Sequence, residues 1–167
     1  MIAGKLTNRR RQRGTAVVET IVATPVLLFL VLIGAEITNA FVDHNTLTKY
    51  ARHAVRHVAE NALQGTTSVV SLDANLVTEA RNLIVFGNTA GTGSPILPGL
   101  TVGNVQVVDL GGNNVQVTIT YPYTGILGNT LPTFRFGADR NLGFNLQATA
   151  TMRALSVSYT HLTLPTS

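Results

Sequence analysis

The first long pattern in the chain is an apolar run of the length that crosses a membrane. Residues 15–35 contain one charged side chain, Glu19, and residues 20–35 contain none. At 1.5 Å per residue, about 20 helical residues cross a hydrocarbon core about 30 Å thick. Pro25 lies inside the run, where it removes one backbone donor and can kink the helix, which membrane helices tolerate. We therefore expect a transmembrane helix over residues 15–35 with a kink at Pro25.

Past Glu36 the apolar residues continue on one side only, at steps of three and four residues. Charged and polar residues take the other side, and neither Gly nor Pro falls between Ala35 and Leu63. This spacing predicts an amphipathic helix that continues the membrane helix and ends near Gly65, a suitable C-cap. The apolar stripe consists of Ile37, Ala40, Phe41, Leu47, Ala51, Ala54, Val55, Val58 and Ala62.

The distal part of the chain changes period from helix to strand. Apolar spacing predicts a shorter helix over residues 71–86, and the Gly-, Thr- and Pro-rich residues 88–99 predict a flexible surface loop. Period-two alternation predicts strands that start near Val105 (or at Val102), over residues 115–121 and over residues 144–153, with a hairpin turn at residues 111–114. One-sided strands need a cover, which the amphipathic helix supplies. The predicted fold class is α+β: a long N-terminal transmembrane-then-amphipathic helix packed on a small antiparallel β-sheet.

The positive charge of the chain is concentrated at its N-terminus. The formal net charge is +4, and five of the twelve Lys and Arg residues lie in the first thirteen positions: Lys5, Arg9, Arg10, Arg11 and Arg13. The remainder carries seven basic and eight acidic residues, so no basic patch for nucleic acid is indicated. A cationic flank before an apolar helix is a topology signal that stays in the cytoplasm. It also argues against a buried helix of a soluble protein. The chain has no cysteine, which excludes a disulfide framework and a thiolate site.

Gly14 and Glu19 form a processing motif between the cationic flank and the apolar helix. If the chain is cut after Gly14, Thr15 becomes the first residue and Glu19 the fifth. This arrangement matches the prepilin signal. In a filament, the Glu19 carboxylate of one subunit can approach the new amine of its neighbour in an apolar core. Pairing offsets part of the desolvation of both charges and fixes the axial register.

The residues around this motif resemble those of the TadE-like minor pilins of the tight-adherence (Flp-type) pilus. The resemblance rests on Arg-Gly-x-x-x-Val-Glu at residues 13–19, on Pro25, and on Gly-Ala-Glu at residues 34–36. Residues 50–56 resemble the family's juxtamembrane segment, and residues 115–123 and 150–153 its distal strands. Two departures are Thr20, where the family usually has an aromatic residue, and Ala54-Val55, where it has Gly-Ala.

The resemblance implies a pseudopilin precursor, not an enzyme, with no cofactor and no metal. A prepilin peptidase would cut between Gly14 and Thr15. The expected organisation is a cytoplasmic leader at 1–14, a membrane helix at 15–35 and an extracytoplasmic domain at 36–155. The protein would be a single-pass protein of the bacterial inner membrane and would enter a pilus used in adhesion, biofilm formation or secretion. The implied partners are the major pilin, a sister minor pilin, the inner-membrane assembly platform and membrane lipid, but no nucleic acid.

Other constellations give weaker predictions. His53, His57 and Glu60 have helical spacing that can hold a metal, but neighbouring arginines favour a solvated helix face. Residues 87–99 lack the Lys-Ser/Thr ending of a phosphate loop. An uncleaved, signal-anchored periplasmic binding or sensor domain remains open, as does an exported enzyme.

The last residues of the chain do not resemble natural protein sequence. Residues 157–166, VSYTHLTLPT, resemble an in-frame translation of a sequencing adapter. The last two bases of the Ser156 codon could belong to the same adapter. We therefore expect residues 156–167 to be an artefactual tail, the alternative being a native polar tail.

Overall fold

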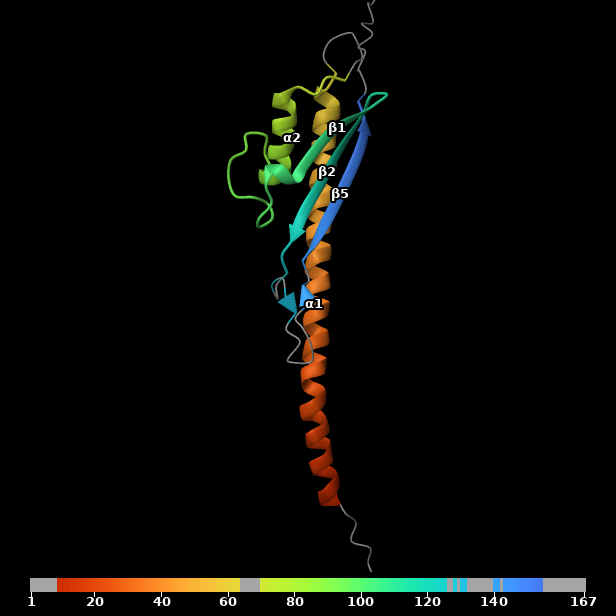
Figure 1. The fold of residues 1–167 in the computed structure, drawn as a ribbon, viewed down its shortest axis with the longest axis vertical. Helices are drawn as coiled ribbons and strands as arrows, with labels where there is room; N and C mark the ends of the chain where they lie inside the picture. Colours follow the sequence, from red (N-terminus) through yellow and green to blue (C-terminus); the bar gives the residue numbers. More distant parts are fainter. Residues whose placement is uncertain are drawn as a thin grey trace, which may run out of the picture. The chain divides into compact units, whose positions relative to one another are not determined.

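A computed structural model describes residues 9–63, 70–125, 128, 130–131, 140–141 and 143–154 (Figure 1). The chain divides into two units, Met1–Asn39 and Ala40–Ser167, which are described separately below. One helix, α1 (Arg9–Asn61), contributes to both units and continues through Pro25. The predicted single long helix is therefore confirmed. It ends at Asn61, and the expected C-cap Gly65 lies outside the described residues.

The first unit consists of the N-terminal part of α1. Its described side chains are almost all exposed, including Val17, Ile21, Leu27 and Val31. Within the described part of the chain, α1 is the one helix that is long and apolar enough to cross a membrane, judged by length and composition. A helix that is apolar all round needs an apolar surrounding, and a bilayer supplies one. α1 thus meets the requirements of a single-pass membrane anchor.

The second unit packs two helices against one face of a three-stranded antiparallel sheet (Figure 1). α2 (Ala74–Phe86) and a short 3-10 helix, η2 (Val102–Asn104), precede β1 (Val105–Gly111), β2 (Asn114–Tyr123) and β5 (Phe144–Arg153). The strand order is β1-β2-β5, so β2 is central. Two short strands, β3 (Thr130–Leu131) and β4 (Arg140–Asn141), form a separate pair that the sequence pattern did not predict. The predicted α+β class is confirmed.

The core lies between the helices and the inner face of the sheet. β2 alternates buried and more exposed residues, as its period-two pattern predicted. The buried apolar side chains come from the second half of α1, from α2, from the loop after it and from the sheet. The largest fully buried ones are Tyr121, Leu47, Ile84, Leu100, Ile119, Val55, Val58, Val85, Val105, Val115 and Val117.

Three boundaries differ from the sequence prediction. Ile37 and Phe41 were assigned to the buried stripe, but both are exposed, so the buried stripe of α1 begins at Leu47. Val102 lies in η2 and not in the first strand. α2 begins at Ala74, three residues later than predicted, with Asp73 in an extended conformation at its N-cap.

The β1–β2 hairpin follows the predicted turn. Gly112 and Asn113 have φ of 60° and 63°, and Gly111 and Asn114 pair across the strands. Positive φ at both central residues is the requirement of a type I′ turn, whose twist matches that of the flanking strands. Gly and Asn are the residues that reach this conformation most readily. The register of β1 on β2 then shifts between Gly111 and Asp109, so the turn alone does not set the pairing of the rest of β1.

Candidate functional site: the N-terminal segment of α1

The Gly14–Thr15 bond lies inside α1, five residues after its first residue. The side chains of residues 9–14 are outside the described set, so the cationic flank remains a prediction from sequence. Thr15 and Glu19 are four residues apart and share one face of the helix. The helix thus presents the proposed new N-terminus and the carboxylate on the same side.

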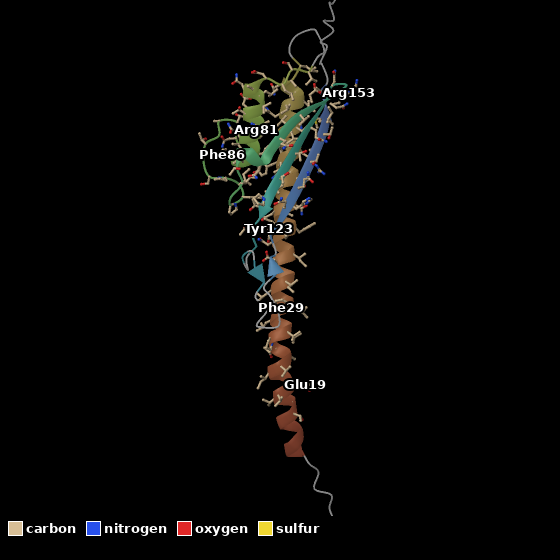
Figure 2. All side chains as sticks on the ribbon, in the orientation of Figure 1. Glu19, Phe29, Arg81, Phe86, Tyr123 and Arg153 are labelled. Carbon is tan, nitrogen blue, oxygen red and sulfur yellow. The ribbon has the colours of Figure 1, made fainter. Side chains whose placement is uncertain are left out.

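Glu19 sits among apolar side chains on an exposed surface (Figure 2). A shallow hollow on this face of α1 is lined by Thr15, Val18, Glu19, Val22, Ala23, Val26 and Leu27. At the centre of a bilayer a lone carboxylate costs about 2.5–3.5 kcal/mol on insertion scales, and Glu19, nearer the end of the span, carries part of that cost. The arrangement leaves the carboxylate available to a group from outside the helix, and a cation there would offset that cost.

The opposite face of the same segment holds hydroxyls that bond within the helix. The Thr20 Oγ1 donates to the carbonyl oxygen of Ala16 at 2.9 Å, and the Thr24 Oγ1 donates to that of Thr20 at 2.7 Å. A second shallow hollow on α1 is lined by Ala16, Val17, Thr20, Ile21, Thr24 and Pro25. Thr20, the departure from the expected aromatic residue, therefore brings no unsatisfied polar group into the span.

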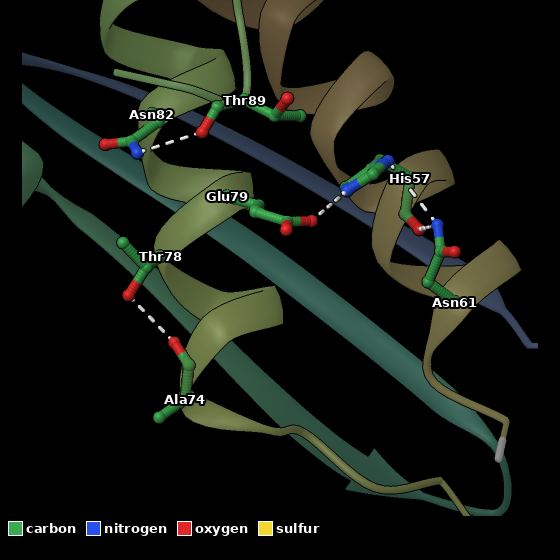
Figure 3. Close-up of polar contacts among 7 residues, drawn as sticks. All are labelled: His57, Asn61, Ala74, Thr78, Glu79, Asn82 and Thr89. Atoms are coloured by element: carbon green, nitrogen blue, oxygen red, sulfur yellow. Dashed lines mark hydrogen bonds and ion pairs between the residues drawn. The ribbon is translucent and has the colours of Figure 1, made fainter.

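His53, His57 and Glu60, predicted to share one solvated helix face, have different surroundings in the structure. His53 is exposed, but the His57 Nε2 lies 3.0 Å from the Glu79 Oε2 on α2 (Figure 3). The His57 side chain is 26% exposed, so the expectation of a solvated histidine is wrong at this position. Glu60 instead pairs with Arg56, at 2.8 Å between Oε1 and Nε. This pairing raises the pKa of Arg56, chiefly through the hydrogen bond.

No cluster of three or more potential metal ligands occurs among the described residues. The contact between His57 and Glu79 joins residues 22 apart in sequence. A helical period reports only neighbours on the same helix, so no sequence signal could have found it.

Residues 87–99, predicted to be a flexible surface loop, are held by hydrogen bonds between side chains and the loop backbone. The Asn88 side chain donates to the carbonyl oxygens of Phe86 and Thr92 and accepts the Thr92 N–H. The Asn82 Nδ2 donates to the carbonyl oxygen of Thr89 at 3.1 Å (Figure 3). The Tyr121 hydroxyl donates to the carbonyl oxygen of Pro98 at 2.8 Å. The loop thus belongs to the packed unit.

Two titratable groups near this core have shifted pKa values. Burial raises the pKa of Tyr121, and the negative charge of Asp43 raises it further. Burial also raises the pKa of Asp43. Both groups lie outside the apolar span of residues 15–35.

A comparison with protein-family models matches residues 14–56 to the family described as TadE-like protein. Residues 14–56 are therefore similar to a TadE-like, pilin-related protein. The match begins at Gly14 and ends at Arg56, about a quarter of the 167 residues. It therefore includes the processing motif, the apolar span and the first part of the buried stripe of α1. Searches of curated proteins and of solved structures find no match to the chain.

Proposed function

We propose that this TadE-like protein is a minor pilin precursor of a tight-adherence pilus. A prepilin peptidase cuts it after Gly14, and the mature chain assembles through its N-terminal helix into the pilus or at its base. The observation that carries the proposal is the position of Glu19, five residues after Gly14 on an exposed apolar helix that matches the TadE-like family. Adhesion, biofilm formation or secretion would be the use of the pilus.

Cleavage would place the new amine where an assembly contact needs it. Thr15 and Glu19 lie on one face of α1, so neighbouring helices that pack on this face bring an amine and a carboxylate into one apolar contact. Such pairing offsets desolvation and penalises every register that leaves a charge alone. The proposed partners are the prepilin peptidase, the major pilin, a sister minor pilin and the inner-membrane assembly platform. The protein acts as a structural subunit and not as a catalyst.

The mature N-terminus tests the processing step. The full chain is co-expressed with a prepilin peptidase, and its N-terminus is determined by mass spectrometry. A chain that begins at Thr15 is expected, and Gly14→Leu is expected to abolish the cut. Gly34→Leu is the matched control, because Gly34 lies in the same helix with no atom near the site of an added Cβ. An uncut chain in both variants and in the wild type would leave the signal-anchored domain as the better account.

The carboxylate is tested separately from cleavage. Glu19→Gln is expected to leave the cut intact and to prevent entry into pili, measured by the amount of the subunit in sheared pilus fractions. Glu36→Gln removes a carboxylate at the other end of the span and serves as the control. Equal loss of assembly in both variants would contradict a special role for Glu19.

A further inference from the structure

The exposed aromatic side chains among the described residues of the second unit are Phe41 and Phe144, with exposed fractions of 65% and 48%. Phe41 lies on α1 and Phe144 is the first residue of β5, so they come from distant parts of the sequence. Val42, next to Phe41, is 54% exposed. Single apolar side chains on a surface are ordinary, but a group of them marks a contact with a partner or a membrane. Their meaning therefore depends on whether they lie together in the fold.

Phe144 marks one end of the sheet. Its ring packs on that of Tyr123, with 5.0 Å between the ring centroids, and the two residues pair at the end of the β2–β5 ladder. Figure 2 shows Tyr123 and Arg153, the last residue of β5, at opposite ends of the sheet. Tyr123 is buried, so Phe144 is the exposed member of the aromatic pair.

The same end of the sheet lies level with the first turns of α1 in this unit. The negative charge of Asp43, on α1, raises the pKa of Tyr121, on β2, so the two side chains lie near each other. Asp43 directly follows Phe41 and Val42 in the helix. β2 runs antiparallel to α1, and its last residues point toward the start of the unit (Figure 1). Phe41, Val42 and Phe144, named the apolar rim below, therefore lie at one end of the unit.

This end is the one at which the chain leaves the apolar span. A hydrocarbon core about 30 Å thick takes about 20 helical residues. Counted from Thr15 the core ends near Ala35, and counted from Thr20, the first residue after Glu19, it ends near Asn39. Phe41 then lies about 3–9 Å beyond the hydrocarbon, in a headgroup layer about 5–7 Å thick or at its outer boundary.

We propose that the apolar rim rests on the membrane surface, with its side chains inserted among the lipid headgroups. Ile37, 66% exposed, joins the exposed apolar surface of the span to Phe41 on the same helix, so one bilayer covers both. Aromatic and other apolar side chains are typical of the boundary between lipid and water. The contact gives the second unit an attachment to the membrane besides the span. It requires the membrane anchor, but neither cleavage nor a pilus.

The rim binds lipid through apolar insertion and not through charge. Neither residues 37–48 of α1, nor β2, nor β5 before Arg153 contains Lys or Arg. Segments on a membrane surface are held by basic side chains, which attract anionic lipids, or by buried apolar area. The composition around the rim favours the second. Neutral phosphatidylcholine is therefore expected to suffice, and the contact is expected to persist at high salt.

A fluorophore on a single cysteine tests the contact, because the wild type has no cysteine. Asn145→Cys is exposed, lies next to Phe144 and leaves the rim intact. Thr151→Cys is the matched control, because it is exposed on the same face of β5 and lies about 20 Å further along the strand. The full chain is labelled and reconstituted, at a low protein-to-lipid ratio, in phosphatidylcholine vesicles with a spin label on the headgroups. The spin label is expected to quench the fluorophore at residue 145 and to spare the one at residue 151.

Removal of the rim side chains separates insertion from mere proximity to the membrane. In the Asn145→Cys chain, Phe144→Ser and Phe41→Ser are each expected to abolish most of the quenching. Met152→Ser is the control, because Met152 is an apolar side chain, 38% exposed, near the other end of β5, and its loss is expected to leave the quenching unchanged. Circular dichroism shows whether the sheet is intact. Phe41→Ser, on the helix, keeps the test decisive if Phe144→Ser does not fold.

Four outcomes would overturn the proposal. The first is equal quenching at residues 145 and 151. The second is quenching at residue 145 that both serine variants of the rim leave unchanged, and the third is quenching that disappears at high salt. The fourth is a change in fluorescence at residue 145 only when the protein-to-lipid ratio is raised, which would assign the rim to a second copy of the chain.

The same measurement distinguishes this inference from the processing step. The Gly14→Leu chain, which is expected to stay uncut, keeps the span and the rim, and its label at residue 145 is expected to be quenched as in the wild type. Quenching in a wild-type chain that the peptidase does not cut would contradict the proposed maturation and keep the lipid contact. A chain that is cut but shows no quenching would do the reverse.

Discussion

Residues 15–35 and residues 47–61 differ in their surroundings, although α1 runs through both. In the first stretch the apolar side chains lie on all sides of the helix and are exposed. In the second they lie on one side and are buried, with Ala51, Ala54 and Val58 at 0% exposure. Both stretches are α-helical, so they differ in what their side chains contact and not in backbone conformation. A helix that is apolar all round needs lipid or other helices, whereas a one-sided helix needs a sheet.

The largest expected effect comes from one substitution that distinguishes a helix face buried in the protein core from a helix face exposed to lipid. Val58→Asp places a carboxylate in the core, and an unpaired buried charge is among the few changes that cost more than about 4–5 kcal/mol. We expect loss of cooperative thermal unfolding of the full chain in detergent, followed by circular dichroism. Membrane extraction by alkaline carbonate is expected to be unchanged.

The matched variant is Val26→Asp in the first stretch, where the side chain is 59% exposed. Here the cost falls on membrane insertion, about 2.5–3.5 kcal/mol for an acid near the helix centre. We expect more protein in the carbonate-extracted fraction and an unchanged unfolding temperature for the correctly inserted chains. Equal effects of both variants on unfolding would contradict the comparison.

The sequence predicted most of this arrangement because periodicity reports local conformation and burial together. The amphipathic part of the long helix and the third strand were visible as runs of period 3.6 and 2, the span as an apolar run, and the hairpin turn from its Gly and Asn residues. Phe41 shows the limit of the pattern. It has the spacing of the buried stripe, but burial also requires a partner opposite it, and the core begins six residues later, at Leu47.

Contacts between distant residues were invisible to the pattern. The loop of residues 87–99 was predicted to be flexible from its Gly and Pro content, yet Asn82 and Asn88 pin it. Side-chain amides bond to whichever backbone lies within reach, and the fold decides which one that is. The predicted processing motif, in contrast, is a local pattern: Gly14, Glu19 and the apolar run lie within one continuous stretch of the sequence.

The next expected effect tests whether the packed region includes that loop. Gly91 has φ of +71°, and an added Cβ would lie 2.7 Å from the Asn82 Nδ2. Gly91→Ala therefore combines backbone strain with a clash, and about 1–3 kcal/mol is expected from the strain alone. Gly93→Ala is the control, since its φ is +101° and nothing lies within 4 Å of the added atom. A larger drop in unfolding temperature is expected for Gly91→Ala, and equal drops would show that the Asn82 contact is unimportant.

A smaller effect comes from Tyr121, which ties the central strand to the loop. Tyr121→Phe removes the hydrogen bond to the Pro98 carbonyl oxygen and leaves that acceptor without it, at a cost of about 1 kcal/mol. The pKa of Tyr121 is raised above its ordinary value of 10.0, first by burial and then by Asp43. The folded state therefore holds this proton more tightly than the unfolded state does. The resulting stability is fully present below pH 10.0 and is lost as the pH rises through the folded pKa.

An absorbance titration of tyrosinate measures this pKa, with Tyr121→Phe as the difference reference. Asp43→Asn is expected to lower the pKa of Tyr121, because it removes the negative charge that adds to the burial effect. An unchanged titration in Asp43→Asn would show that the two groups are not coupled.

The smallest expected effect compares two side-chain contacts of the second half of α1, the hydrogen bond between His57 and Glu79 and the ion pair between Arg56 and Glu60. His57 and Glu79 join α1 to α2, with side chains 26% and 47% exposed, whereas Arg56 and Glu60 pair within α1 at 70% and 59%. Exposed contacts between charged side chains contribute little to stability, and less at high salt. Glu79→Gln is therefore expected to lower the unfolding temperature slightly at low salt, and Glu60→Gln to lower it less, because its partner stays on the same helix and its loss frees no second element. A larger effect for Glu60→Gln would mean that the surface charges of α1 stabilise it more than its contact with α2 does. It would then be local helix chemistry, and not packing against neighbouring elements, that distinguishes the two stretches of α1.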